Sequence, residues 1–225
     1  MIDKTKNYLR NYSIINFFIN LRDLLSWQKR HFVQPSPNFI KRAIIKKYTV
    51  PNSIFIETFT SDHGKYTGVV YGGSSKKQKR NFQIGNKILL DWKSKNENRS
   101  GYFKVELIKP ISPFFFDDKK RSACILSATS ILKILLPERQ TNKKVYKLFE
   151  NMLIDLRSEN WIRLYINWEL SLIKELGYET NLKTNYNNDT KKALTFNRSL
   201  LMENFIIPNR LKFPLFRNIL ENYFL

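Results

Sequence analysis

Residues 53–73 read SIFIETFTSDHGKYTGVVYGG, and they indicate the fold class of the chain. Their first part alternates between two sets of side chains, one beginning at Ile54 and the other at Phe55, which is the period of a β-strand with two distinct faces. The turn residues 62–64 interrupt the pattern, and a second apolar run then ends at the glycine pair 72–73. This arrangement predicts two strands separated by a turn.

Similar runs of Ile, Val, Phe, Tyr and Thr surround this stretch within residues 38–113, and turn residues bound each of them. The expected strands are Ala43–Tyr48, Ser53–Thr60, Tyr66–Tyr71, Lys87–Trp92 and Tyr102–Ile108. Five short strands in so small a segment predict a closed barrel, for which the five-stranded OB-fold is the common example. An SH3-like barrel is the alternative.

The sequence after the predicted barrel has helical periodicity instead. The expected helices are Lys119–Leu136, Asn142–Arg157, Asn160–Leu176, Lys191–Phe205 and Pro214–Phe224. Before the barrel, apolar residues at helical spacing over 14–25 predict an amphipathic helix, followed by the proline-containing linker 34–37. The chain therefore reads as an α+β protein with an N-terminal extension (1–37), an OB-fold domain (38–113) and a helical domain (114–225).

The charge of the chain is its most informative bulk property. Lys and Arg number 39 against 19 Asp and Glu, so the net charge is +20 and the pI is about 10.0. Residues 38–113 alone carry 15 basic and 5 acidic residues. An AT-rich coding bias would raise Lys, but it would raise Glu as well, and acidic residues are few. The excess therefore indicates a polyanionic partner such as nucleic acid.

The cations and aromatic residues of the predicted barrel are the candidate nucleic-acid contacts. Four cations follow the glycine pair 72–73 within residues 76–80, where a loop between strands is expected to attract phosphate. A solvated loop without a partner is the alternative. Among the aromatic residues, Tyr48 and Tyr66 have charged neighbours and are expected to stack on bases, whereas Phe82 and Trp92 are expected in the core. The DNA-binding candidates are Arg42, Lys46, Lys47, Lys65, Tyr66, Lys76, Lys77, Lys79, Arg80 and Lys93.

No residue pattern predicts catalysis, a metal or a cofactor. The Asp117-Asp118 pair is expected to cap the helix that follows it, and Ser61-Asp62-His63 is expected to form a turn rather than a catalytic triad. The lone cysteine, Cys124, lies in an apolar helix stripe and is expected to be inert core. Glu169 stands among apolar residues and is expected to cap or pair within the bundle. With one cysteine and two histidines, no zinc site is expected.

Several segments resemble motifs of the bacterial RecO family of DNA repair proteins, particularly its alphaproteobacterial branch. They are Phe59–Gly73, Leu135–Arg139, Trp168–Leu170 and Leu176–Tyr178, with a weaker match at Leu194–Phe205. Their order is that of the family over residues 39–182. The chain departs from the family in residues 1–37, which match nothing. It also departs at Val50–Ser53 and in the short, cysteine-free segment 179–192, where some members carry a zinc module.

The resemblance implies an OB-fold followed by helices and a non-enzymatic recombination mediator. Such proteins bind single- and double-stranded DNA, anneal complementary strands, dock on the C-terminal tail of single-strand-binding protein, and act with RecR to help load RecA. A cytoplasmic, nucleoid-associated location is expected, without a membrane partner. The candidate tail-binding residues are Lys143, Lys144, Arg157, Trp161, Arg163 and Tyr165.

Two other interpretations remain open from the sequence. The first is an RNA-binding or ribosome-associated OB-fold protein, because cations and aromatic residues serve either nucleic acid. The second is a membrane-surface protein that uses the predicted helix over residues 14–25.

Overall fold

A computed structural model of the chain describes residues 40–50, 52–79, 81–93, 101–178 and 189–224. The chain divides into two compact units, residues 1–36 and residues 37–225, and every described residue belongs to the second unit. The helix predicted over residues 14–25 therefore lies outside the described residues.

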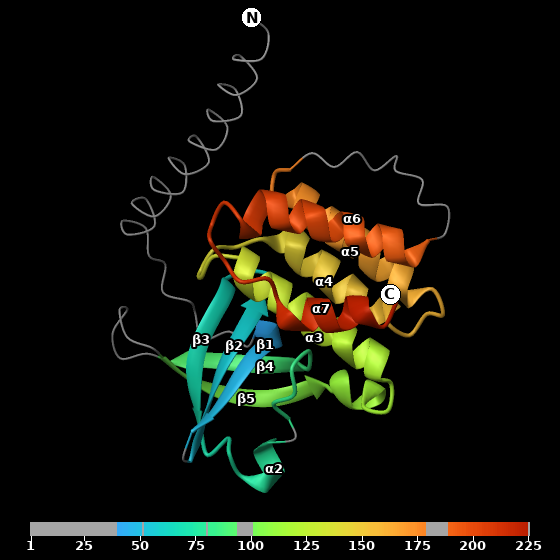
Figure 1. Cartoon of the computed structure of the whole chain (residues 1–225). Helices are drawn as coiled ribbons and strands as arrows, with labels where there is room; N and C mark the ends of the chain where they lie inside the picture. The colour runs from blue at the N-terminus through green and yellow to red at the C-terminus, as the bar shows by residue number, and fades with distance from the viewer. Residues whose placement is uncertain (1–39, 51, 80, 94–100, 179–188, 225) are drawn as a thin grey trace, which may run out of the picture. The chain divides into compact units, whose positions relative to one another are not determined.

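Five strands form the first part of the second unit. They are β1 (Ile40–Val50), β2 (Ser53–Thr60), β3 (Gly64–Tyr71), β4 (Lys87–Lys93) and β5 (Gly101–Lys109). Each strand pairs with two others in the order β1-β2-β3-β5-β4, which closes into a barrel (Figure 1). The β3–β5 pairing is parallel and the other four are antiparallel. The five predicted strands are confirmed, with ends that differ by a few residues.

The inner face of the barrel is set by the alternation visible in the sequence. Ile54 and Ile56 on β2 are fully buried with Ile88 and Leu90 on β4, as the strand period requires. Gly68 on β3 allows close contact with β5, because a Cβ atom there would lie 2.5 Å from the ring of Phe103. The barrel thus has a small apolar core of its own.

The second part of the unit is helical, so the predicted α+β class is confirmed. The helices are α2 (Lys76–Lys79), η1 (Ser112–Phe115), α3 (Lys119–Leu135), α4 (Lys143–Asp155), α5 (Trp161–Glu175), α6 (Thr190–Leu201), η2 (Met202–Ile206) and α7 (Leu215–Asn222). α3 begins where the sequence predicts, because the Asp118 carboxylate accepts a hydrogen bond from the Arg121 amide at 2.9 Å. The helix predicted to run to Phe205 is α-helical only to Leu201, and η2 is a turn of π-helix.

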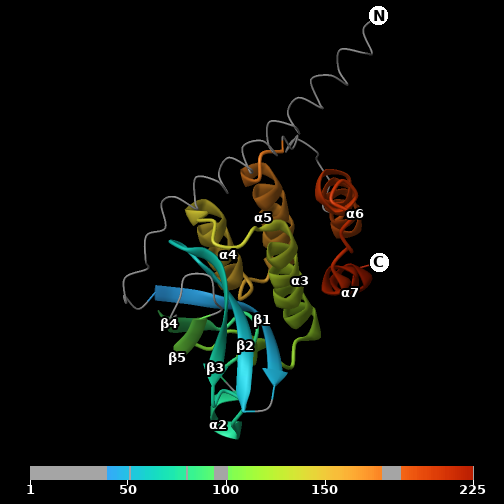
Figure 2. The same ribbon diagram turned by 90° about the vertical axis from the view of Figure 1, so that its left-hand side faces the viewer.

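The α3–α4 connection fastens the helices to one end of the barrel (Figure 2). Phe59 on β2 is fully buried in the helical core, with its ring 5.5 Å from that of Tyr146. The Arg139 amide donates to the Lys65 carbonyl oxygen at 2.9 Å. A Cβ on Gly64, whose φ is +71°, would lie 2.0 Å from the Gln140 carbonyl oxygen. This glycine is therefore required by both its backbone conformation and the close approach.

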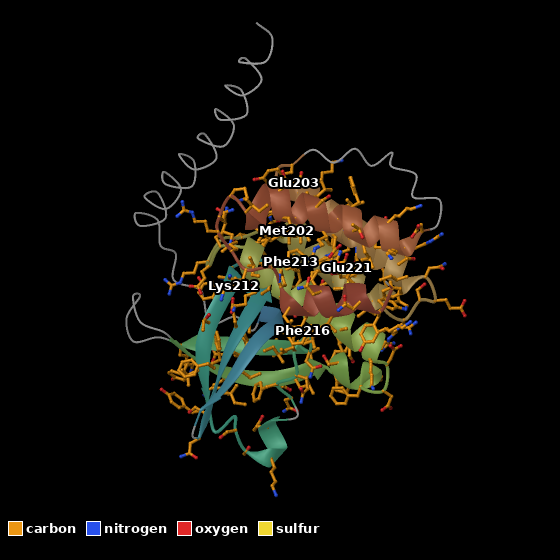
Figure 3. The ribbon with its side chains drawn as sticks, viewed as in Figure 1. Met202, Glu203, Lys212, Phe213, Phe216 and Glu221 are labelled. Atoms are coloured by element: carbon orange, nitrogen blue, oxygen red, sulfur yellow. The ribbon has the colours of Figure 1, made fainter. Side chains whose placement is uncertain are left out.

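A buried ion pair fastens α7 to the rest of the helices. Arg217 on α7 and Glu169 on α5 are both fully buried, and Nε of the arginine lies 2.6 Å from Oε1 of the glutamate. Tyr165 and Asn197 also donate to this carboxylate, at 2.6 and 3.0 Å. Glu221 lies on the side of α7 that faces α6 (Figure 3), and its carboxylate accepts a hydrogen bond from Arg217 at 3.3 Å. The prediction that Glu169 pairs within the bundle is confirmed.

Candidate nucleic-acid interface

The predicted DNA contacts on β1 and α2 are only partly within the described residues. Arg42, Lys46 and Lys47 lie on β1, where the backbone alone is described. The same holds for two of the cations on α2, and Arg80 lies outside the described residues. Lys76, at the start of α2, is exposed. α2 lies at the opposite end of the barrel from α3–α7 (Figure 1).

The segment after the glycine pair is more ordered than the predicted loop. Gly72 has a φ of +70° and donates its amide to the Asn52 carbonyl oxygen at 2.8 Å, which turns the chain sharply after β3. Residues 76–79 then form the short helix α2. Three residues of the predicted basic cluster, Lys76, Lys77 and Lys79, thus lie on a helical turn between β3 and β4.

The prediction that Lys65 contacts phosphate is wrong. Lys65 is only 7% exposed, and its Nζ donates a hydrogen bond to the Lys133 carbonyl oxygen at 2.8 Å. The same Nζ lies 3.4 Å from a carboxylate oxygen of Glu57. The charge is satisfied within the protein, so Lys65 joins β3 to α3 instead of facing solvent.

The prediction that Tyr66 stacks on bases is also wrong. Tyr66 is 9% exposed and belongs to the barrel core, and the guanidinium carbon of Arg139 lies 5.7 Å from its ring centroid. The strand period explains this result, since Tyr66 shares its face with Gly68 and Val70, which are also buried. Phe82 is buried as predicted, whereas the side chains of Tyr48 and Trp92 lie outside the described residues.

Lys93 remains an exposed cation, and its aromatic neighbours in the structure are not among the predicted DNA contacts. It lies opposite Tyr102 in the β4–β5 pairing, and Tyr102 lies opposite Val69 in the β3–β5 pairing. Tyr71 is 71% exposed, and its ring centroid is 5.9 Å from that of Tyr102. With the exposed Lys104 on β5, the residues Tyr71, Lys93, Tyr102 and Lys104 form what we call the wall patch.

The wall patch is polar and cationic on balance. Lys93 lies 3.6 Å from a carboxylate oxygen of Asp91, which is largely buried, so this lysine is partly compensated. Lys104 pairs in register with Asp91 across the strands and remains exposed. The period of β3 places Tyr71 on the same face as Thr67, opposite to that of Tyr66, so the sequence separates the two tyrosines but does not say which of them faces outward.

The aromatic residues predicted to receive a protein tail are core residues, and that part of the prediction is wrong. Trp161 is 7% exposed, and Tyr165 is fully buried with its hydroxyl 2.7 Å from Ser127 Oγ. Residues spaced along one helix face are buried here because α5 is central to the helical core. Burial raises the pKa of Tyr165 well above its usual value, and the negative charge of Glu169 adds to this effect.

The predicted cations of the helical part do not form one site. Lys143 lies 3.6 Å from Asp62, and Lys144 lies 3.5 Å from Glu175. Lys143 begins α4, whereas Arg157 lies just after its C-terminal end. The rise of an α-helix places the two residues about 20 Å apart. Arg163 is exposed on α5.

Arg157 instead borders a groove of about 170 Å³ between the barrel and α4, which we call the η1 groove. Phe114 on η1 and Ile154 on α4 are each about 60% exposed, and the Arg157 guanidinium carbon lies 5.0 Å from the Phe114 ring centroid. Lys87 and Lys109 also line it, the former paired with Glu150. The groove thus has an apolar floor and a cationic rim, built from segments far apart in the sequence.

The titratable residues of the described parts do not assemble into a metal site. In those parts, no three His, Cys, Asp or Glu residues come together as metal ligands would. Cys124 is a free, fully buried thiol whose pKa burial raises well above its usual value, as expected of a core cysteine. A bilayer-spanning helix, long and apolar over its full length, does not occur among the described helices.

Comparison with known proteins identifies the relatives of this chain. Residues 117–199 match the family described as "Recombination protein O C terminal". A DNA repair protein RecO of Rickettsia africae is 37% identical over 139 residues, which cover 62% of this chain and 58% of the relative. The chain is related to the RecO DNA repair proteins. The RecO of Wolbachia pipientis is 35% identical over 156 residues, and that of Ehrlichia chaffeensis is 34% identical over 154 residues.

The relationship to RecO spans a part of those proteins. The two longer matches cover 68% of this chain and 62% of the relatives, so the chain corresponds to about three fifths of their length. The match to the RecO C-terminal family runs from just before α3 to within α6. It therefore contains Glu169, the acceptor of the buried ion pair, but ends before its partner Arg217.

Proposed function

We propose that this chain is a DNA-binding mediator of recombinational repair that acts without making or breaking covalent bonds. Its relationship to RecO proteins carries the proposal, because these relatives are named DNA repair proteins. The net charge of +20 supports it, since nucleic acid is the polyanion that such a charge suits. The domains would be the predicted ones, an OB-fold over 38–113 and a helical domain over 114–225.

The OB-fold assignment within this proposal is supported by the barrel topology. Five strands in the order β1-β2-β3-β5-β4, with a parallel contact between β3 and β5, leave no open sheet edge. OB-folds use a strand face and flanking loops for oligonucleotides. The wall patch lies on β3, β4 and β5, and the next element after β3 is α2, which contains Lys76, Lys77 and Lys79 of the basic cluster.

The proposed mechanism is electrostatic. Two complementary strands repel each other through their phosphates, and a strongly cationic surface reduces that repulsion when it binds both of them. Base pairing then proceeds between strands held at high local concentration. No catalytic residue is required for this process. In the cell, the protein would act with RecR and would indirectly assist RecA in the cytoplasm, at the nucleoid.

The salt dependence of binding tests the proposed DNA contact. Replacing the basic cluster (Lys76, Lys77, Lys79 and Arg80) with Ala should lower the salt slope on duplex DNA by up to about four, and on single strands by up to about three. An unchanged slope would mean that this cluster is merely solvated. Competition with RNA of matched sequence distinguishes the alternative, because an RNA-binding or ribosome-associated protein would be displaced from DNA by RNA.

We further propose that the acidic, aromatic-ended tail of single-strand-binding protein docks in the η1 groove rather than at Trp161. Such a tail needs an apolar slot for its terminal ring and a cation for its carboxylate. Phe114 and Ile154 supply apolar surface, and Arg157 supplies a planar guanidinium that carboxylates bind well.

Titration of a labelled tail peptide with the full chain tests this docking. Arg157→Glu should weaken micromolar binding at least tenfold, because it reverses the charge at the groove rim. Lys174→Glu, on exposed α5 surface outside the groove, makes the same change in net charge and should have little effect. Equal loss in both variants would indicate non-specific attraction, and no loss in either would place the tail elsewhere.

A further inference from the structure

We infer that Tyr71 and Tyr102 form a stacking platform for unpaired bases, so that the wall patch distinguishes single strands from duplexes. This inference rests on the proposed nucleic-acid function and adds to it the residues that recognise unpaired bases. It replaces Tyr66, which the structure buries in the barrel core.

The exposure of Tyr71 is the first argument, with the half-buried Tyr102 beside it. Tyr71 is the most exposed of the large apolar or aromatic side chains in the described parts of the chain, and it is the last residue of strand β3 of the closed barrel. Exposing so large a ring to water costs free energy, which would be recovered if a ligand covered the ring. A ring kept in this position is therefore available to a ligand with a flat apolar face.

The geometry of the pair is the second argument. The ring centroids of Tyr71 and Tyr102 are 5.9 Å apart and their planes are inclined by 49°. The two rings come from neighbouring strands: Tyr102 on β5 pairs with Val69 on β3, and Tyr71 lies two residues beyond Val69 on the same face of β3. A tilted pair of this kind offers one ring face for stacking, with the second ring beside it as a wall.

The surrounding charge is the third argument, and it selects the ligand. Lys93 lies directly across the strands from Tyr102, and Lys104 follows Tyr102 on the same face of β5. Cations beside exposed rings suit a chain that has both a phosphate backbone and free base faces. Duplex DNA has its base faces stacked on each other, so it would contact the lysines but not the rings.

The test compares binding of the full chain to an unpaired thymidine oligonucleotide, to its uridine equivalent and to a hairpin duplex. Tyr71→Ala and Tyr102→Ala should each weaken binding to unpaired strands by about 5- to 150-fold per stacked base, with hairpin affinity nearly unchanged. Tyr71→Phe should retain most of the affinity, because the ring remains. Phe116→Ala, which removes another exposed ring from the segment before α3, should change neither affinity.

The salt dependence separates this inference from the proposed function. The tyrosine variants should keep the wild-type salt slope, since the rings carry no charge, whereas Lys93→Ala should lower the slope on single strands by about 0.7. Thymidine and uridine strands should be affected alike. If the wild type binds neither strand nor hairpin, the proposed function fails. If it binds both and the alanine variants lose nothing, or lose hairpin affinity equally, the stacking inference alone is overturned.

Discussion

Replacement of Arg217 by Met should be among the most destabilising single changes in the helical part. The side chains of Arg217 and Glu169 are both 0% exposed, and their contact is bidentate, at 2.6 Å (Nε–Oε1) and 3.2 Å (Nη2–Oε2). Nη2 also donates to the Leu194 carbonyl oxygen at 2.9 Å. Removing the arginine leaves a buried carboxylate without its cation, which costs about 3–5 kcal/mol.

The double replacement of both residues by Met should be much less harmful than Arg217→Met alone. A buried ion pair exchanged for apolar side chains of similar volume is often neutral in stability, because no uncompensated charge remains. Here Tyr165 and Asn197 would each lose an acceptor, at a cost of about 1 kcal/mol each, so recovery should be incomplete. The coupling energy from the double-mutant cycle should therefore be favourable and exceed about 1 kcal/mol.

Urea unfolding monitored by tryptophan fluorescence measures these changes. The midpoint should fall in Arg217→Met while the m-value stays constant. A cost below about 1 kcal/mol, or equal costs for the single and double replacements, would refute the role assigned to this pair.

Three smaller changes test other parts of the account. Gly64→Ala should destabilise the protein more than Gly72→Ala. Both glycines have φ near +70°, but only at position 64 would the new Cβ clash with another part of the backbone. The midpoints of urea unfolding measure the difference. Asp118→Ala should cost about 1 kcal/mol at pH 7. Burial opposes ionisation of Asp118, but hydrogen bonds from Arg121 outweigh this effect and lower the pKa of its carboxyl below 3.8. The difference in stability between the variant and the wild type should therefore vanish as the pH falls through that lowered pKa. Cys124 should resist iodoacetamide in the folded protein and react in urea, as mass spectrometry will show.

The strands and helices could be predicted from the sequence because their signals are local. Alternation around Ile54 and the apolar spacing along α5 each lie within one element, and the structure reproduces them. The same patterns do not reveal which face turns inward when both carry aromatic residues. The sequence therefore predicts Tyr66 on the outer face, whereas the structure buries it together with Gly68 and Val70.

Contacts between distant segments were not predictable in this way. Glu169 stood out as a carboxylate among apolar residues, but its partner Arg217 is 48 positions away with no pattern that joins them. The η1 groove draws on β4, β5, η1 and α4, and the wall patch on three strands. Such sites depend on strand register and on packing between distant segments, which the local patterns of a single sequence do not reveal.

Strand annealing tests the central claim most directly. Two complementary oligonucleotides, each coated with single-strand-binding protein, should form duplex faster when the full chain is added, with a rate that declines as salt increases. The variant lacking the basic cluster of α2 should anneal more slowly, in proportion to its loss of DNA affinity. An annealing rate equal to that without the protein, under conditions where the chain is folded, would contradict the account.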